Sequence, residues 1–344
     1  WGVILAPIHM NKLKEGELTM NKLGKIGVSA LCGSLAGISA ANAGDLTVSG
    51  GADLSWVSQE KAVVGQPIGM GSNYTFSGDG ELENGWTVDL NIQMANASAY
   101  SNTNITIGLP GMGDIRLDQG VSATGIQRLD DITPNVWEEA DGGITAGINK
   151  IMGTSAGGTV EITPSGLPDG VTARFAFSKD ADSAVNAGDK GVGGASGSLG
   201  SGWDLTLELG SDILGVDGLT LYGGISEIEQ HQNDATKNGD VSEDVLGIKY
   251  AMGAFAVGYQ QTNEDTGITA TTSYENTSYG VTFNVNDDLS IGYNHTESDK
   301  AGNSYDAEAD AFQIAYTMGG ASIRLMEQSV ENQTYSSAGT ADFD

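Results

Sequence analysis

The chain of 344 residues has few cysteines, histidines, prolines and basic residues. It contains 1 Cys, 3 His, 6 Pro and 15 Lys plus Arg against 45 Asp plus Glu. A single thiol excludes a disulfide framework and a cysteine-based metal site. So few basic side chains also argue against a nucleic-acid-binding surface, and the sequence has neither an HExxH motif nor a phosphate-binding loop.

Glycine is abundant, at 51 residues, and apolar and polar side chains alternate in segment after segment. One such segment places Trp203, Leu205, Leu207 and Leu209 between Asp204, Thr206 and Glu208. A period of two gives an extended strand one apolar and one polar face. Because about fifteen such segments occur without amphipathic helices to cover them, we predict an all-β fold, an antiparallel transmembrane β-barrel with a wet interior.

The predicted strands differ in the length of their connections. They cover residues 45–57, 72–82, 86–95, 103–109, 114–118, 158–163, 171–178, 203–210, 219–229, 242–251, 254–263, 272–285, 289–298, 307–317 and 320–330. Short turns alternate with longer polar loops at 58–71, 179–202, 230–241 and 299–306. Short turns on one side and long loops on the other are typical of outer-membrane barrels.

Residues 20–43 have the features of a signal peptide. Lys22 and Lys25 precede an uncharged stretch, and small residues provide a cleavage site after Ala43. A transmembrane anchor is the alternative, but the stretch is shorter than the roughly 20 apolar residues that a spanning helix needs. We therefore predict export of the mature chain through the periplasm.

The segments on either side of the signal peptide have different interpretations. Residues 1–19 do not begin with Met, so we interpret them as translated upstream sequence and exclude them from the fold, with Met10 as an alternative start. Residues 44–344 form the predicted barrel domain. Cys32 lies inside the signal peptide, and a lipoprotein anchor would need Leu where Ser29 stands. We interpret Cys32 as a small apolar residue without a chemical role.

Three stretches make the chain similar to a known family: Gly44–Gly51, Phe76–Gly85 and Asp130–Glu139. The chain resembles Gram-negative general porins of the sixteen-stranded type, in particular porins of marine alphaproteobacteria. This resemblance implies an outer-membrane channel for passive diffusion of small hydrophilic solutes and ions. It also implies a homotrimer in contact with the lipid bilayer and with lipopolysaccharide.

The resemblance fails at the C-terminal end. Porins of this type end on a strand whose last residue is Phe, whereas this chain stops at Asp344, and Phe343 does not end an amphipathic strand. A barrel without its last strand has two unpaired edges in lipid. We therefore expect a fragment that has fifteen of sixteen strands.

The resemblance implies that the long connection after the fifth strand, residues 119–157, folds inward and narrows the lumen. Its acidic side chains face arginines on strand positions whose apolar neighbours face lipid, and such charges set up a transverse field where water is confined. The alternative is that these carboxylates only solvate the loop or pair with the arginines to hold it. The predicted constriction residues are Arg116, Asp118, Arg128, Asp130, Asp131, Glu138, Glu139, Asp141, Arg174 and Arg324.

Acidic residues also dominate the strand positions that face the lumen. These are Asp53, Asp79, Glu81, Asp89, Asp114, Asp204 and Glu208. Residues 44–344 carry 11 basic and 43 acidic side chains, a net charge of -32. We therefore predict a preference for cations, although part of this charge can serve to solubilise outer loops or to bind divalent ions that bridge lipopolysaccharide.

We predict no cofactor, no metal and no catalytic activity. The loop residues Asp299, Asn303, Asp306, Glu308 and Asp310 offer oxygen ligands for Ca²⁺ but lack the spacing of a calcium-binding loop. Outside residues 1–43 the histidines are His231 and His295, and neither lies in a recognisable catalytic motif.

Two other functions stay open. One is a substrate-specific outer-membrane channel, which would have the same barrel pattern. The other is a secreted structural or adhesin protein built as a β-solenoid, but a solenoid has a fixed short repeat, and this sequence shows none.

Overall fold

The computed structural model describes most of the chain outside the N-terminal region. The described residues are 2–5, 47–56, 68–95, 102–120, 124–130, 132–140, 151–156, 158–181, 199–230, 239–268, 273–319 and 321–335. The predicted signal peptide lies outside these ranges.

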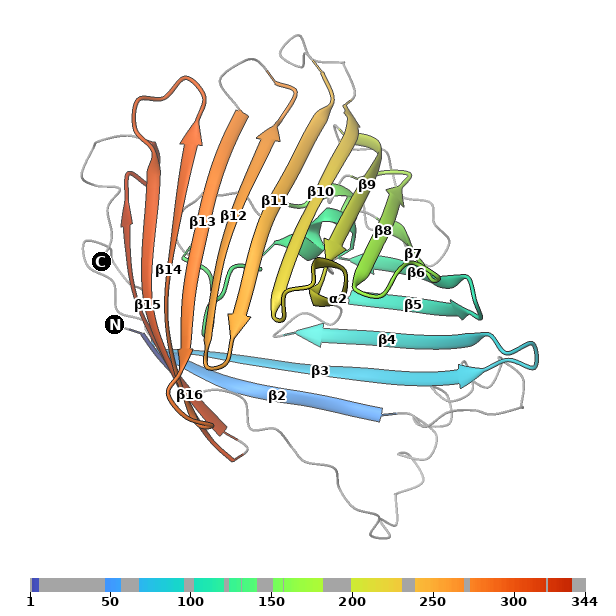
Figure 1. Ribbon diagram of the computed structural model, residues 1–344, viewed down its shortest axis with the longest axis horizontal. Helices are drawn as coiled ribbons and strands as arrows, with labels where there is room; N and C mark the ends of the chain where they lie inside the picture. Colours follow the sequence, from blue (N-terminus) through green and yellow to red (C-terminus); the bar gives the residue numbers. More distant parts are fainter. Residues whose placement is uncertain are drawn as a thin grey trace.

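The described part of the chain is nearly all β-structure (Figure 1). Each of the fifteen strands predicted from the alternation has a counterpart, which confirms the fold class. The strands are β1 Gly2–Leu5, β2 Thr47–Trp56, β3 Ile68–Glu81, β4 Thr87–Ala95, β5 Asn102–Leu109, β6 Gly113–Gly120, β7 Gly158–Pro164, β8 Val171–Ser178, β9 Leu199–Leu209, β10 Leu219–Gln230, β11 Val241–Met252, β12 Phe255–Asp265, β13 Ser273–Asn284, β14 Leu289–Lys300, β15 Ala307–Met318 and β16 Ala321–Glu331.

The strands form a single antiparallel sheet that closes into a barrel. Each of β2 to β16 pairs with its neighbours in the sequence, and β1 pairs with both β2 and β16. Gly2–Leu5 is the part of residues 1–19 that the structure describes, and it lies between β2 and β16. It gives hydrogen-bond partners to part of each of these two edges, whose N–H and C=O groups would otherwise be unpaired there. The interpretation of residues 1–19 as translated upstream sequence stays a prediction.

The two faces of the wall differ as the alternation predicts. On β9, Leu205 is 45% exposed on the outer face, whereas Asp204 is fully buried on the inner face. On β15, Phe312 is exposed outside and Gln313 is buried inside. Exposed apolar side chains around the whole outer face are unfavourable in water and suit a lipid environment.

Two strands begin earlier than predicted. β3 starts at Ile68 and β9 at Leu199, so parts of the predicted loops 58–71 and 179–202 belong to the wall. Glycines occupy the inward positions of these strand starts, for example Gly69 and Gly200. A segment whose inward positions are glycines has no polar face, and the alternation therefore does not reveal it.

The connections are short at the end of the barrel where β3, β5, β7 and later odd-numbered strands finish. The turn 82–86 joins β3 to β4, residues 253–254 join β11 to β12, and a short helix, α2 Ser211–Leu214, lies between β9 and β10. Gly253 in one of these turns has φ 59, a conformation that favours glycine. Several of the longer connections at the opposite end lie largely outside the described residues, whereas the connection 301–306 is described in full.

A lysine at Leu207 tests the orientation of the wall. Leu207 faces outward on β9, and Thr172, on the adjacent strand, faces the lumen opposite Glu208. Leu207→Lys should cost about 2–4 kcal/mol because it places a cation in hydrocarbon, whereas Thr172→Lys should cost much less. Guanidinium-induced unfolding in lipid vesicles measures the free energy of unfolding of both variants. Equal losses of this free energy would show that the two faces of the wall are assigned wrongly.

Candidate constriction site

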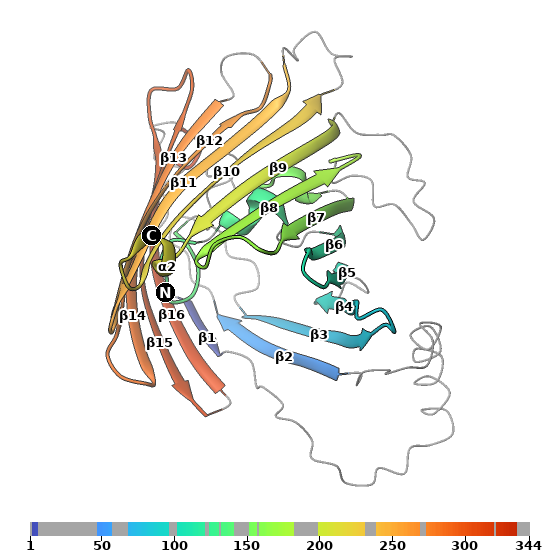
Figure 2. The same ribbon diagram turned by 45° about the vertical axis from the view of Figure 1, so that its right-hand side comes forward.

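The connection between β6 and β7, called here the inner loop (residues 121–157), lies on the concave side of the sheet. Its described parts include two short 3-10 helices, η1 Gly125–Leu129 and η2 Gly153–Ala156. Figures 1 and 2 show them beside β8, β9 and β10, within the curve of the wall. The loop starts slightly later than predicted, since β6 continues to Gly120.

The first half of the inner loop is attached by apolar packing. Ile126 and Leu129 of η1 are fully buried in a cluster with Tyr222 of β10 and Val245 of β11. Gly224 on the inner face of β10 makes room, because a Cβ there would lie 3.0 Å from Ile126 and 3.2 Å from Leu129. Two apolar side chains thus fix η1 against the wall.

Three carboxylates of the wall accept hydrogen bonds from η1 and η2 of the inner loop. Glu161 accepts from the Gly125 N–H at 2.7 Å, and Glu243 from the Gly153 N–H at 2.8 Å. Asp204 accepts from the N–H of Ile126 at 3.2 Å and from the hydroxyl of Thr154 at 2.9 Å. Backbone N–H groups of a loop have no sheet partner, so these acceptors remove the cost of burying them.

Three of the four predicted arginines are ion-paired. Arg116 contacts Asp118 at 2.8 Å, Arg128 contacts Glu161 at 2.6 Å, and Arg174 pairs with Glu208 across β8 and β9. The fourth, Arg324, lies on the inner face of β16 opposite Ala315. The Arg116 and Arg174 pairs each lie within one region of the wall. The Arg128 pair joins the inner loop to the wall.

The Arg128 pair reverses the charge arrangement that we predicted for this part of the loop. The base is on the loop and the acid is on the wall. Burial lowers the pKa of Arg128, but the hydrogen bond and the charge of Glu161 raise it by more, so the pKa lies above its ordinary value and the side chain stays charged. The paired charges of Arg128 and Glu161 hold the loop against the wall at this point.

The second half of the inner loop is held by two amide side chains of the wall, Gln313 and Asn294, called here the amide clamp. Gln313 Oε1 accepts from the N–H groups of Val136 at 3.0 Å and Trp137 at 2.8 Å. The carbonyl of Glu138 accepts from Gln313 Nε2 and, at 3.0 Å, from Asn294 Nδ2. Gln313 is 1% exposed, so its hydrogen bonds to the loop are shielded from water.

Three glycines, called here the glycine bed, lie beneath the same part of the loop. A Cβ at Gly258 would lie 2.4 Å from Pro134 Cδ, one at Gly280 2.1 Å from the Pro134 carbonyl oxygen, and one at Gly292 2.6 Å from Val136 Cγ2. Gly258 and Gly280 are opposite each other on β12 and β13. The missing side chains allow the loop to lie directly on the wall.

The predicted acidic residues of the loop have different environments. Glu138 is exposed, and Glu139 is 8% exposed and accepts hydrogen bonds from the N–H and hydroxyl of Thr133. Asp130 is partly exposed and ends η1. Asp131 and Asp141 lie outside the described residues. Of the three described acidic residues, Glu138 is therefore the most exposed.

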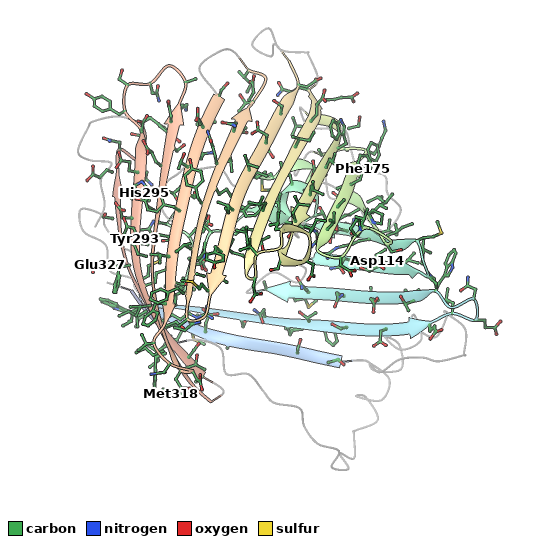
Figure 3. All side chains as sticks on the ribbon, viewed as in Figure 1. Asp114, Phe175, Tyr293, His295, Met318 and Glu327 are labelled. Carbon is green, nitrogen blue, oxygen red and sulfur yellow. The ribbon has the colours of Figure 1, made fainter. Side chains whose placement is uncertain are left out.

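Strands β2, β3, β4 and β6 carry most of the other predicted acids. Asp79 and Glu81 of β3, Asp89 of β4 and Asp114 of β6 are exposed on inward positions, and Asp53 of β2 is partly exposed (Figure 3 labels Asp114). Asp79 and Asp89 are directly opposite each other, an arrangement of like charges that is unfavourable unless cations lie nearby. Asp204 also faces inward, but it is buried beneath the inner loop.

Sequence reasoning missed the residues that hold the loop. Glu161 lies between outward-facing Val160 and Ile162, so the alternation could have given its orientation. The same holds for Gln313, which lies between Phe312 and Ile314, but not for Glu243, whose neighbours Ser242 and Asp244 are polar. No local pattern, however, shows that residues 177 positions apart, such as Val136 and Gln313, form a hydrogen bond.

The candidate calcium ligands and His295 lie on or near the outer ends of β14 and β15. Asp310 accepts a hydrogen bond from Tyr293, and its Oδ1 lies 2.9 Å from Nδ1 of His295. Figure 3 labels Tyr293 and His295. The ring of His295 stacks on Tyr279 with 4.9 Å between centroids. Within the described ranges, no group of three or more His, Cys, Asp or Glu side chains could hold a metal ion. His231 is not among the described residues.

The closed sheet, the apolar outer face and the loop held inside the lumen together define a transmembrane β-barrel with an internal loop. Residues 27–320 match the family model of Gram-negative porins, and the chain belongs to this family. Among the described residues, no helix is long and apolar enough to cross a membrane. No curated protein matches the chain.

Solved structures agree with this fold. A mutant of Rh. blastica porin has a TM-score of 0.53 at 12% identity, over 83% of this chain and 94% of that one. OmpT, an outer membrane protein of Vibrio cholerae, has a TM-score of 0.53 at 9% identity, over 85% and 89%. Its loop L8 deletion mutant has a TM-score of 0.55 at 10% identity, over 83% and 99%.

The family assignment excludes one of the two other functions left open by the sequence. Gram-negative porins are diffusion channels of the outer membrane and not enzymes. The predictions of an outer-membrane location and of no catalytic activity are thereby confirmed, and a secreted β-solenoid is excluded.

Replacing the central glycine of the bed tests how the loop is seated. Gly280→Val places a side chain where Pro134 lies and should lower the free energy of unfolding by roughly 1–3 kcal/mol. Gly158 on β7 is the matched control, because a Cβ there would have no atom within 4 Å. Thermal unfolding in detergent compares the two, and a Gly280→Val protein as stable as Gly158→Val would mean that the loop does not rest on the bed.

Proposed function

We propose that this protein forms a water-filled channel that lets small hydrophilic solutes and ions diffuse passively across the outer membrane, with a preference for cations. The observation that carries the preference is the charge of the lumen. Glu138 on the inner loop and Asp79, Asp89 and Asp114 on inward positions of the wall are exposed, so the loop and the wall both contribute carboxylates to the lumen.

The pairing of three of the four predicted lumen arginines supports the same proposal. Arg116, Arg128 and Arg174 are each paired with a carboxylate at or within hydrogen-bonding distance. An ion pair has little net field at the distance of a passing ion, whereas the exposed carboxylates act in confined water where screening is weaker than in bulk. The exposed carboxylates therefore attract cations into the lumen and repel anions.

We also propose a homotrimer of the sixteen-stranded type, in contact with the bilayer and with lipopolysaccharide. The outer face of the barrel is asymmetric: Leu54, Trp56 and Met70 keep β2 and β3 apolar up to the longer-loop end. At the same end, Glu297 and Glu327 face outward from β14 and β16. Apolar side chains at that height are better covered by a neighbouring subunit than by lipid headgroups.

The selectivity of single channels tests the proposed function. In a KCl gradient across a planar bilayer, the reversal potential should have the sign of cation preference and the current should be ohmic. Glu138→Gln should lower the K⁺/Cl⁻ permeability ratio roughly fivefold, since a unit charge about 8 Å away in water contributes about 0.5 kcal/mol, favourable for K⁺ and unfavourable for Cl⁻. The charge-matched control is Asp287→Asn in the turn between β13 and β14.

Each outcome of this measurement has a separate meaning. Equal permeability of K⁺ and Cl⁻ in the unmodified protein would refute the cation preference. Currents that saturate with one solute and are absent for others would instead indicate a substrate-specific channel. A Glu138→Gln channel that keeps the original ratio would show that the inner loop does not form the selective region.

A further inference from the structure

The chain after β16 turns back into the barrel. Asn332 and Tyr335 have φ of 51 and 55, and the Tyr335 N–H donates to the Asn332 carbonyl at 2.6 Å. Asn tolerates this left-handed conformation, whereas a residue as bulky as Tyr adopts it rarely. A turn of this kind persists only where other contacts compensate for the strain.

The compensating contacts are those of the Tyr335 side chain. It is 5% exposed and belongs to a packed cluster, called here the Tyr335 cluster, whose other buried members are Ala140, Ala307, Ala309, Ala311 and Val330. The three alanines are on the inner face of β15, where their small side chains leave space for an aromatic ring. Ala140 belongs to the inner loop and is fully buried.

Polar groups fix the same ring. The Tyr335 hydroxyl lies 2.9 Å from the hydroxyl of Ser298 on β14. Burial raises the pKa of Tyr335 to about 12, so the hydroxyl stays protonated and available for this hydrogen bond. Lys300 Nζ lies 5.4 Å from the centre of the Tyr335 ring and 5.2 Å from that of Tyr274, within the range of a cation–π contact.

We propose that Tyr335 is a positioning residue for the constriction. Through the Tyr335 cluster it holds the Ala140 end of the loop segment 132–140 against β15, two residues from the exposed Glu138. The amide clamp fixes this segment on one side of Glu138, and Tyr335 fixes it on the other. The segment that follows β16 thus takes part in the constriction along with the inner loop.

A cysteine at Ala140 tests the contact directly. In a Cys32→Ser background, Ala140→Cys is the only thiol, and its reaction rate with a water-soluble methanethiosulfonate reagent reports how well this position is covered. In the folded protein the reaction should be slow. Adding Tyr335→Ala should make it about tenfold faster or more, because local opening exposes the site.

Two further variants separate the ring from its hydroxyl and from general effects of losing a tyrosine. Tyr335→Phe keeps the packing and the cation–π contact and should leave the thiol protected. Tyr305→Ala removes an exposed tyrosine from the connection between β14 and β15 and should also have no effect. A thiol that reacts at one rate in all variants, whether fast or slow, would overturn the proposal.

Single-channel selectivity of the same variants gives the second readout, and only this readout rests on the proposed function. Tyr335→Ala should lower the K⁺/Cl⁻ permeability ratio as Glu138→Gln does, whereas Tyr335→Phe and Tyr305→Ala should not. Tyr335-dependent thiol protection in a protein that conducts no ions would support the positioning role and refute the channel. Cation-selective currents, together with a thiol reaction rate that does not change in Tyr335→Ala, would support the channel and refute the positioning role.

Discussion

Hydrogen bonds between neighbouring strands satisfy the backbone of the wall, and they force successive side chains to alternate between lipid and lumen. All fifteen strands after residue 46 obey this constraint. The inner face is therefore free of the apolar requirement that governs a soluble core. Carboxylates, amides and glycines can occupy it, and these are the groups that the inner loop needs.

The backbone of the inner loop needs hydrogen-bond partners, and side chains of the wall provide them. A segment inside the barrel has backbone N–H and C=O groups without sheet partners, and burying them unpaired is costly. Glu161, Asp204 and Glu243 accept from the N–H groups of one half, and Gln313 with Asn294 serves the other half. An inward carboxylate has in consequence two distinct uses: Asp204 stabilises the loop, whereas Asp79 faces the water of the lumen.

The strands could be predicted from the sequence because alternation is a local property. The residues next to Leu205 and Asp204 are enough to predict which face of the strand each occupies. The fold class follows from such predictions along the chain. The environment of each inward residue could not be predicted in the same way. Asp204 and Asp79 occupy equivalent positions in the pattern, and what separates them is whether a distant loop covers them.

Residues without a chemical signal were the hardest to foresee. Gly280 looks like any glycine of a strand, yet it lies under Pro134, 146 positions away in the sequence. Tyr335 follows the last strand and resembles an ordinary loop aromatic. The burial of Tyr335 depends on the alanines of β15. In the sequence these alanines can be recognised only as small residues on the inner face of a strand.

The attachments of the inner loop also have a mechanical consequence. They lie on β7, β9 and β11 for one half of the loop and on β12 to β15 for the other. The loop therefore ties widely separated parts of the wall together across an arc of the barrel. Such a tie resists flattening of the cross-section under lateral membrane pressure, so the segment that narrows the lumen also helps to keep it round.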